Sequence, residues 1–442
     1  MKPPFALGLR EAAAAITTGT LSSVDLVASC LDRIRLWESR VQAWVHLDEA
    51  GALRAARAAD RRRGAQSSRV DALPGIPVGI KDIIDVAGMP TRMGSPIYAD
   101  HWPRASARLV ERLARSGAIP LGKAVTTEFA FMAPSRTRNP WNAAHTPGGS
   151  SSGSAAAVAC GMVPAALGTQ TNGSVIRPAA FCGVVGYKPG KGRISIEGVL
   201  PFSTTLDQPG VFARSVSDAA LLASWITDQA SVISHDIAVA KTAPCLYAVR
   251  SPVWDRTEPA QRQRFDADIA ALRAGGADVR ERELPPAFAD AHRVHRTIML
   301  AEAARAAHAI RLRHRDGISE TLNRALDEGE GIRDATYQEA LDARSRLIEA
   351  FTAFVDDGRA AVITPPAAGE APQGLEATGD PAFCTIWTLL GTPAITIPTG
   401  LGPRGLPLGL QIVARPLESN YLLAVAAWCE RHLPFAGLIP GE

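Results

Sequence analysis

The sequence has few lysines, no paired cysteine motif, no long apolar segment and no large excess of charge. Its six cysteines are scattered without CxxC spacing, which predicts buried thiols in a reducing compartment. The net charge of +3 comes from interspersed residues and gives no sign of a nucleic-acid partner. The longest weakly polar run, Ala155–Gly168, is too short and too interrupted by Gly and Pro to cross a membrane. With no signal-peptide pattern at the start, we expect a cytoplasmic protein.

The 442 residues have an apolar content of 46% and a charged content of 21%, which is typical of a globular protein with a substantial core. Predicted helices and strands alternate along the chain, as in the helix Val216–Ile226 and the strand Leu408–Val413. This alternation predicts an α/β layered fold. No repeat or low-complexity linker divides the chain, so we expect a single domain over residues 1–442.

One stretch, Thr146–Lys188, is dense in Gly, Ser and Ala and almost free of charge. Its first Ser-Gly cluster, Ser150–Ser152, precedes the helix predicted at Ala155–Cys160, so these serines are expected at a helix N-terminus. Its second cluster, Thr169–Ser174, offers successive backbone N–H groups beside a hydroxyl. A hydroxyl next to such donors is what acyl transfer requires, because it supplies a nucleophile and an oxyanion hole.

A serine nucleophile needs a base, and no histidine lies near Ser174 in the sequence. Only six of the 47 basic residues are lysines, and one of them, Lys81, ends an apolar run that is typical of a strand. Burial disfavours a charged amine, so Lys81 is a candidate base. The alternative at this point is a Lys81 side chain that reaches the surface or pairs with Asp82 or Asp85.

Three other patterns are weaker. Gly117–Lys123 has the spacing of a phosphate-binding loop but lacks its final Ser or Thr and follows a predicted helix. Gly149–Gly153 fits the G-x-S-x-G pattern with Ser151 as nucleophile, but no strand-like run precedes it. His292 and His295 are spaced like metal ligands on a helix, but no third ligand is near, so we expect a solvated pair.

Several segments together resemble the amidase signature family, whose members hydrolyse amides through a Ser–cis-Ser–Lys triad. They cover both ends of the chain in the family's order, and the pattern GTQTNGSVIRPAA resembles malonamidase-like bacterial enzymes most. The matching segments are Gly75–Asp82, Thr146–Val158, Gly168–Pro189, Thr204–Gly210, Ala213–Ala220, Gly379–Gly400 and Gly405–Pro416.

This resemblance implies roles for individual residues. Lys81 is the base, Ser150 the bridging serine and Ser174 the nucleophile, and the Gly149–Ser150 peptide is cis. The oxyanion hole is formed by backbone N–H groups of four residues, namely Thr171, Asn172, Gly173 and Ser174. No metal or organic cofactor is required.

The sequence departs from the common family pattern at two positions near the predicted nucleophile. Gln170 stands where most members have Asp, and Asn172 stands where most have Gly. Asn tolerates unusual φ values, so the oxyanion loop can form. The Asn172 side chain is expected to narrow the pocket or to donate an extra hydrogen bond, which makes it a candidate for substrate contact. Gly149 and Ser151, at the first serine cluster, are further candidates, and Ser151 is alternatively expected to support Lys81 and Ser150 as a hydrogen-bond donor.

Further substrate-binding candidates lie on either side of the serine clusters. Phe129 and Met132, on the long loop Thr126–His145, are expected either to line a pocket or simply to pack. Arg177 is expected either to hold a substrate carboxylate, as the resemblance implies, or to have a structural role. Asp207 is expected to hold its loop in place.

The resemblance also implies the architecture and the reaction. We expect a single α/β/α sandwich with a central mixed sheet, a signature core at about 70–220 and a helical substrate-channel insertion at about 285–357. The implied activity is hydrolysis of a C–N bond in small amides, anilides or carbamates (urethanes), with esters as side substrates. The alternative is the glutaminase-type subunit of an amidotransferase complex, which needs a partner. A homodimer is a further expectation, since dimers are common in the family.

Overall fold

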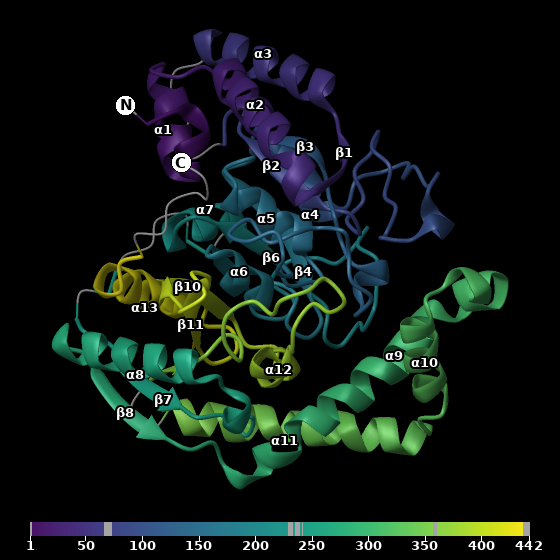
Figure 1. Ribbon diagram of the computed structural model, residues 1–442, viewed down its shortest axis with the longest axis vertical. Helices are drawn as coiled ribbons and strands as arrows, with labels where there is room; N and C mark the ends of the chain where they lie inside the picture. Colours follow the sequence, from purple (N-terminus) through teal and green to yellow (C-terminus); the bar gives the residue numbers. More distant parts are fainter. Residues whose placement is uncertain are drawn as a thin grey trace.

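A mixed sheet of eleven strands forms the centre of the computed structural model, which describes residues 2–65, 73–228, 233–234, 239–240, 242–356 and 360–435 (Figure 1). Strand β2 lies between two parallel neighbours, β3 and β4, and most of the other pairs are antiparallel. In spatial order the strands are β1 (Trp44–Leu47), β3 (Ile119–Ala124), β2 (Pro77–Lys81), β4 (Ala165–Gln170), β6 (Gln208–Ala213), β5 (Val185–Lys188), β10 (Ala394–Leu401), β11 (Pro407–Val413), β9 (Ala361–Thr364), β7 (Cys245–Val249) and β8 (Asp278–Arg282).

Helices cover both faces of this sheet. Successive side chains of a strand point to opposite faces of the sheet. In β4, Ala165 and Leu167 belong to one apolar cluster and Ala166 to another, so an apolar cluster lies on each face. One cluster includes side chains from α2 (Ser23–Val41), α3 (Glu49–Ala65), α5 (Ser152–Ala159) and α6 (Ile176–Cys182). The other includes side chains from α1 (Leu9–Thr18), α4 (Arg108–Arg115), α7 (Val216–Ile226), α8 (Pro259–Ala274) and α13 (Ser419–His432). The predicted α/β/α sandwich is confirmed.

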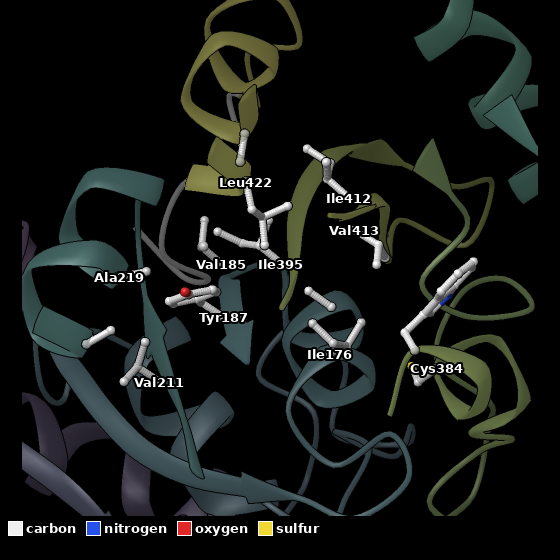
Figure 2. Close-up of a cluster of buried hydrophobic side chains, with 14 of the residues drawn as sticks. Ile176, Val185, Tyr187, Val211, Ala219, Cys384, Ile395, Ile412, Val413 and Leu422 are labelled. Atoms are coloured by element: carbon white, nitrogen blue, oxygen red, sulfur yellow. The ribbon is translucent and has the colours of Figure 1, made fainter. Parts of the chain in front are cut away.

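The second cluster fills the middle of the molecule. In Figure 2, Leu422 of α13 lies above Ile395 of β10 and Val185 of β5, and Tyr187 is next to them. All four side chains are buried, and their contacts join the C-terminal strands and helix to the central serine-rich segment. Burying each large apolar side chain contributes about 1.5–3 kcal/mol to folding. The two sequence-distant halves of the sheet therefore fold as one core.

A group of three helices lies beside the sheet, in the range 285–357 where a helical insertion was expected. They are α9 (Ala291–His314), α10 (Glu320–Glu330) and α11 (Asp334–Asp356), and they extend as a green arm at the lower right of Figure 1. Helix α10 was not predicted, although Ser319 caps it and Leu322 and Leu326 form its buried stripe. Helix α12 (Ala382–Leu389) packs against α9.

Most of the local signals produced the expected elements. Ser22 caps α2 by accepting the Asp25 N–H, and α7 has the predicted bounds. The segment Gly117–Lys123 runs into strand β3, so it is not a phosphate-binding loop. Within the described residues no helix is both long enough and apolar enough to span a bilayer.

Lys123 of β3 forms an ion pair with Asp82 immediately after β2. The Nζ–Oδ1 distance is 3.1 Å, and both side chains are fully buried. Lys123 also donates to Pro90 O and to Thr91 Oγ1. Asp82 therefore pairs with Lys123, which excludes the alternative that Asp82 neutralises Lys81.

Replacing one member of this pair should destabilise the fold. We expect Lys123→Met to lower the free energy of unfolding by about 3–5 kcal/mol, because the Asp82 carboxylate is left buried without a counter-charge. Denaturant unfolding followed by tryptophan fluorescence measures the change. Arg293→Met, in the exposed pair with Asp290, is the matched control and should cause little change. Equal shifts in the two variants would contradict this interpretation.

Candidate active site

Lys81 ends strand β2, and its side chain is fully buried beneath the serine-rich segment. Its Nζ lies 2.8 Å from Ser150 Oγ and 2.8 Å from Thr169 Oγ1. Burial lowers the pKa of Lys81 to about 7, although Asp207 opposes part of this shift. A neutral amine in this place can accept a proton from the Ser150 hydroxyl. Thr169, the second partner, was not predicted.

The Gly149–Ser150 peptide bond is cis, as the resemblance implies. A Cβ on Gly149 would lie 2.8 Å from the side chain of Thr378, so only glycine fits there. The Ser150 carbonyl accepts the Thr127 N–H at 3.3 Å, and the Ser150 side chain is only 2% exposed. The close packing of Gly149 against Thr378 and the hydrogen bond from Thr127 to the Ser150 carbonyl thus hold the hydroxyl of Ser150 beside Lys81.

Ser151 does not reach the surface that a substrate could contact. Its side chain is fully buried, and its Oγ donates to Thr169 O at 3.2 Å and accepts the Thr169 N–H at 3.4 Å. These contacts disfavour the predicted contact of Ser151 with substrate. Ser151 instead ties the start of α5 to strand β4 and keeps Thr169 beside Lys81.

Ser174 lies between the end of β4 and the start of α6, with an exposed fraction of 8%. The structure shows no hydrogen bond from the Ser174 hydroxyl to any described residue. We call residues 171–174 the oxyanion loop. Its four backbone N–H groups donate to no acceptor among the described residues, so they are free to bind a negatively charged oxygen.

The carbonyl groups of the oxyanion loop are held from the opposite side. The donors are His295 Nε2 to Thr171 O at 2.9 Å, Thr388 Oγ1 to Asn172 O at 2.5 Å and the Arg177 N–H to Gly173 O at 3.0 Å. A peptide group whose carbonyl is fixed also has a fixed N–H direction, because the group is planar. These three contacts therefore determine where the N–H groups of Asn172, Gly173 and Ser174 point.

Gln170 closes the oxyanion loop at its base. Its Oε1 accepts the N–H groups of Val175 and Ile176 at 2.8 and 3.0 Å, and its Nε2 donates to Thr388 Oγ1 at 2.9 Å. An amide can accept and donate at once, whereas a carboxylate can only accept. This explains physically how Gln serves where most of the family has Asp.

Asp207 supports the same loop from the β6 side. Its Oδ1 accepts from Thr171 Oγ1 at 2.5 Å, and its Oδ2 accepts the N–H groups of Phe202 and Ser203. These contacts agree with the expectation that Asp207 holds a loop. It was not predicted, however, that the held residue would be Thr171 of the oxyanion loop.

The predicted pocket-wall residues differ from one another. Phe129 is buried, has a φ of +46° and packs edge-on against Tyr98 at a ring-centroid distance of 5.9 Å. Phe129 therefore packs in the core. Met132 is 38% exposed and remains available for contact. Asn172 is partly exposed, and because its Oδ1 accepts from Thr385 Oγ1 at 2.6 Å, its NH₂ group is the end left free.

Arg177 is buried behind the serines. Its Nη2 donates to Gly149 O at 2.7 Å and to Thr378 Oγ1 at 3.2 Å, and its Nη1 donates to Gly379 O. The guanidinium thus ties the carbonyl before Ser150 to the 378–379 segment. These contacts disfavour the predicted role in binding a substrate carboxylate, because a carboxylate would have to displace protein oxygens in a closed site.

The histidine pair on α9 is not solvated, which corrects the sequence expectation. His295 is 1% exposed, and His292 Nε2 lies 2.9 Å from Ala382 O. Each ring therefore has a backbone carbonyl as its partner. No group of three metal-ligating side chains is found among the described residues.

Comparison with known proteins places this geometry in a family. The sequence matches the family described as Amidase over residues 25–423. The chain belongs to the amidase family. It is similar to a glutamyl-tRNA(Gln) amidotransferase subunit from Chloroflexus aggregans, with 34% identity over 95% of each chain.

Two solved structures show how far the fold of this amidase-family hydrolase is shared. A crystal structure of an amidase has a TM-score of 0.87 and 31% identity over 97% of this chain and 100% of its own. The peptide amidase of Stenotrophomonas maltophilia has a TM-score of 0.84 and 28% identity over 98% of both chains. The predicted fold and family are confirmed, while the malonamidase-like grouping stays a prediction.

The pKa of Lys81 predicts how amide hydrolysis depends on pH. Because burial lowers this pKa to about 7, the amine is neutral above that pH and protonated below it. We expect kcat/KM to fall about tenfold per pH unit below pH 7 and to be level above it. The measurement is a pH profile of kcat/KM from pH 5 to 9.

Lys188 provides a matched control, since burial also lowers its pKa to about 7. Its Nζ contacts Gln208 Oε1 and Thr392 O rather than a serine hydroxyl. The activity that remains in Lys188→Met should keep the inflection, and Lys81→Met should be inactive. If Lys188→Met is active and its pH profile has no inflection, the inflection arises from Lys188 and the prediction for Lys81 is wrong.

The contacts of Arg177 predict an equal effect on different substrates. We expect Arg177→Ala to lower kcat/KM for malonamate and for neutral amides by similar factors, because it releases the carbonyl of Gly149 beside Ser150. Arg313→Ala, which removes an exposed arginine of α9, should leave kcat/KM unchanged for both kinds of substrate. A loss confined to acidic amides would restore the carboxylate-binding hypothesis.

Proposed function

We propose that this chain is an amidohydrolase that cleaves the C–N bond of small amides, anilides or carbamates through an acyl-enzyme on Ser174. One observation carries the proposal. A buried amine whose pKa is about 7 is 2.8 Å from the Ser150 hydroxyl, in a segment that also presents the oxyanion loop. A proton relay and an oxyanion site together are the two requirements of serine acyl transfer.

The proposed reaction begins with the neutral Lys81 amine. Lys81 accepts the proton of Ser150, and Ser150 accepts the proton of Ser174 as its Oγ attacks the substrate carbonyl. The N–H groups of residues 171–174 stabilise the oxyanion that forms. The relay returns the proton to the leaving nitrogen, the C–N bond breaks, and an ester to Ser174 remains.

Deacylation repeats these steps with water. Water loses a proton to the relay and attacks the ester, after which the Ser174 oxygen leaves and recovers a proton. The products are the free amine and a carboxylic acid, or, from a carbamate cleaved at its C–N bond, the free amine and a carbonic acid monoester. Esters are expected as side substrates, because Ser174 attacks the same carbonyl carbon in an ester and the leaving oxygen, like the leaving nitrogen, needs only a proton from the relay.

A second candidate function is that of the glutaminase component in an amidotransferase complex. It is favoured by the 34% identity to the glutamyl-tRNA(Gln) amidotransferase subunit over nearly the whole chain. The same relay would then release ammonia from glutamine for use by a partner. The 31% identity to a protein described simply as an amidase, over 97% of this chain, supports the hydrolase.

A substrate panel tests the proposal. The purified chain is assayed on acetanilides, aliphatic amides, malonamate, glutamine and an aryl carbamate. We expect hydrolysis of at least one non-glutamine substrate, and a loss of at least about 10³-fold in Ser174→Ala, because the nucleophile is removed. Thr385→Ser, which keeps the hydroxyl that holds Asn172, is a conservative control near the site and should remain active.

Other outcomes distinguish the alternatives. Hydrolysis of glutamine alone, or activity that appears only when a partner protein is added, supports the amidotransferase function. Activity that survives Ser174→Ala on every substrate shows that Ser174 is not the nucleophile.

A further inference from the structure

Helix α9 carries a buried histidine whose ring meets the oxyanion loop. His295 Nε2 lies 2.9 Å from Thr171 O, and the side chain is 1% exposed. A carbonyl oxygen only accepts, so Nε2 must carry the hydrogen. Burial lowers the pKa of His295 to about 4, which keeps the imidazole neutral at ordinary pH. His295 is therefore a fixed, uncharged donor.

The hydrogen bond from His295 acts on a peptide group of the oxyanion loop. The carbonyl of Thr171 and the N–H of Asn172 belong to the same peptide group, and that N–H is one of the free donors of the oxyanion loop. A hydrogen bond to the carbonyl end polarises the group and strengthens its N–H as a donor. The same bond prevents rotation of the peptide plane. Both effects are useful only where an oxyanion forms.

A second side chain of α9 supports the same residue indirectly. Glu302 lies seven residues after His295 and so is on the same face of the helix. It accepts the Thr205 N–H at 2.9 Å, the Tyr337 OH at 2.7 Å and the Ser203 hydroxyl. This fixes the 203–207 loop, whose Asp207 accepts from Thr171 Oγ1. Thr171 is thus held through its carbonyl directly by α9, and through its side chain by Asp207, whose loop Glu302 of α9 contacts.

We propose that His295 is a positioning residue of the reaction, which acts by donating from Nε2 to the Thr171 carbonyl and so orienting the Asn172 N–H toward the oxyanion. The proposal rests on the proposed function, since it gives the oxyanion loop its task. On this proposal, α9 contributes to the reaction by fixing the direction of an N–H group of the oxyanion loop.

Two nearly isosteric variants separate the donor from the packing. His295→Met fills the site without a donor, and His295→Gln places an amide NH₂ near the position of Nε2. We expect Met to lower kcat about 10- to 100-fold with little change in KM, a smaller loss than that of a direct oxyanion donor. Gln should recover most of the kcat. His308→Met, which changes an exposed histidine of the same helix, should match the parent enzyme.

Each kcat is normalised to the reactive Ser174 determined by fluorophosphonate titration, so partial unfolding does not count as a slower reaction. Equal losses in Met and Gln, or a Met variant with the parental kcat, would overturn the proposal. If Met is too unstable to assay, His295→Asn replaces it, because its amide is one methylene too short to reach Thr171 O. Ser174→Ala is run in parallel, and activity surviving there would reject the proposed function itself and not the role of His295.

Discussion

The hydrogen bonds of the buried Lys81 amine are the constraint on which the surrounding structure depends. Three described lysines, Lys81, Lys123 and Lys188, have fully buried side chains, and each has different partners. Lys123 faces the Asp82 carboxylate, which favours its charged form, and Lys188 faces an amide oxygen and a carbonyl oxygen, which only accept. Lys81 alone of the three has only hydroxyl partners, which can donate as well as accept. Lys81 is therefore the one of these three amines that faces hydroxyl groups and no carboxylate, so in its neutral form it can accept a proton from Ser150.

The oxyanion loop presents the complementary problem, because free N–H groups near the protein interior are unfavourable. An unsatisfied donor costs about 1–3 kcal/mol when buried, so the loop would turn its N–H groups toward protein oxygens if it could. The hydrogen bonds to the carbonyl groups of Thr171, Asn172 and Gly173 oppose this rotation. Gln170 adds a tie across the base of the loop. The site is thus kept ready by contacts on the side of the loop that faces away from substrate.

The sequence predicted the parts of this arrangement that depend on local pattern or on family resemblance. Helix α7 has the bounds predicted for Val216–Ile226, and the roles proposed for Lys81 and Ser150 come from the matching motifs. The contact between Thr171 and His295 joins residues 124 positions apart, and nothing in the local sequence of α9 reveals it. A solvated histidine pair was expected because no third metal ligand lies near it in the sequence, and the sequence does not show which backbone carbonyls the fold brings to the two rings. Phe129 was expected either to line a pocket or to pack, and in the structure its ring packs against Tyr98 and also lines an apolar cavity with Leu200 and Phe202.

Helix α9 contacts both the oxyanion loop and an apolar cavity. Its buried polar face holds the oxyanion loop, and Ala303, Ala307 and Ile310 line an apolar cavity together with Leu200 and Phe202. Leu200 and Phe202 also border a smaller cavity that reaches Thr169, Thr171 and Asp207. A substitution that moves α9 to enlarge the apolar cavity therefore also moves the donor to the Thr171 carbonyl. The lining of this cavity and the hydrogen bond to the oxyanion loop therefore depend on the position of the same helix.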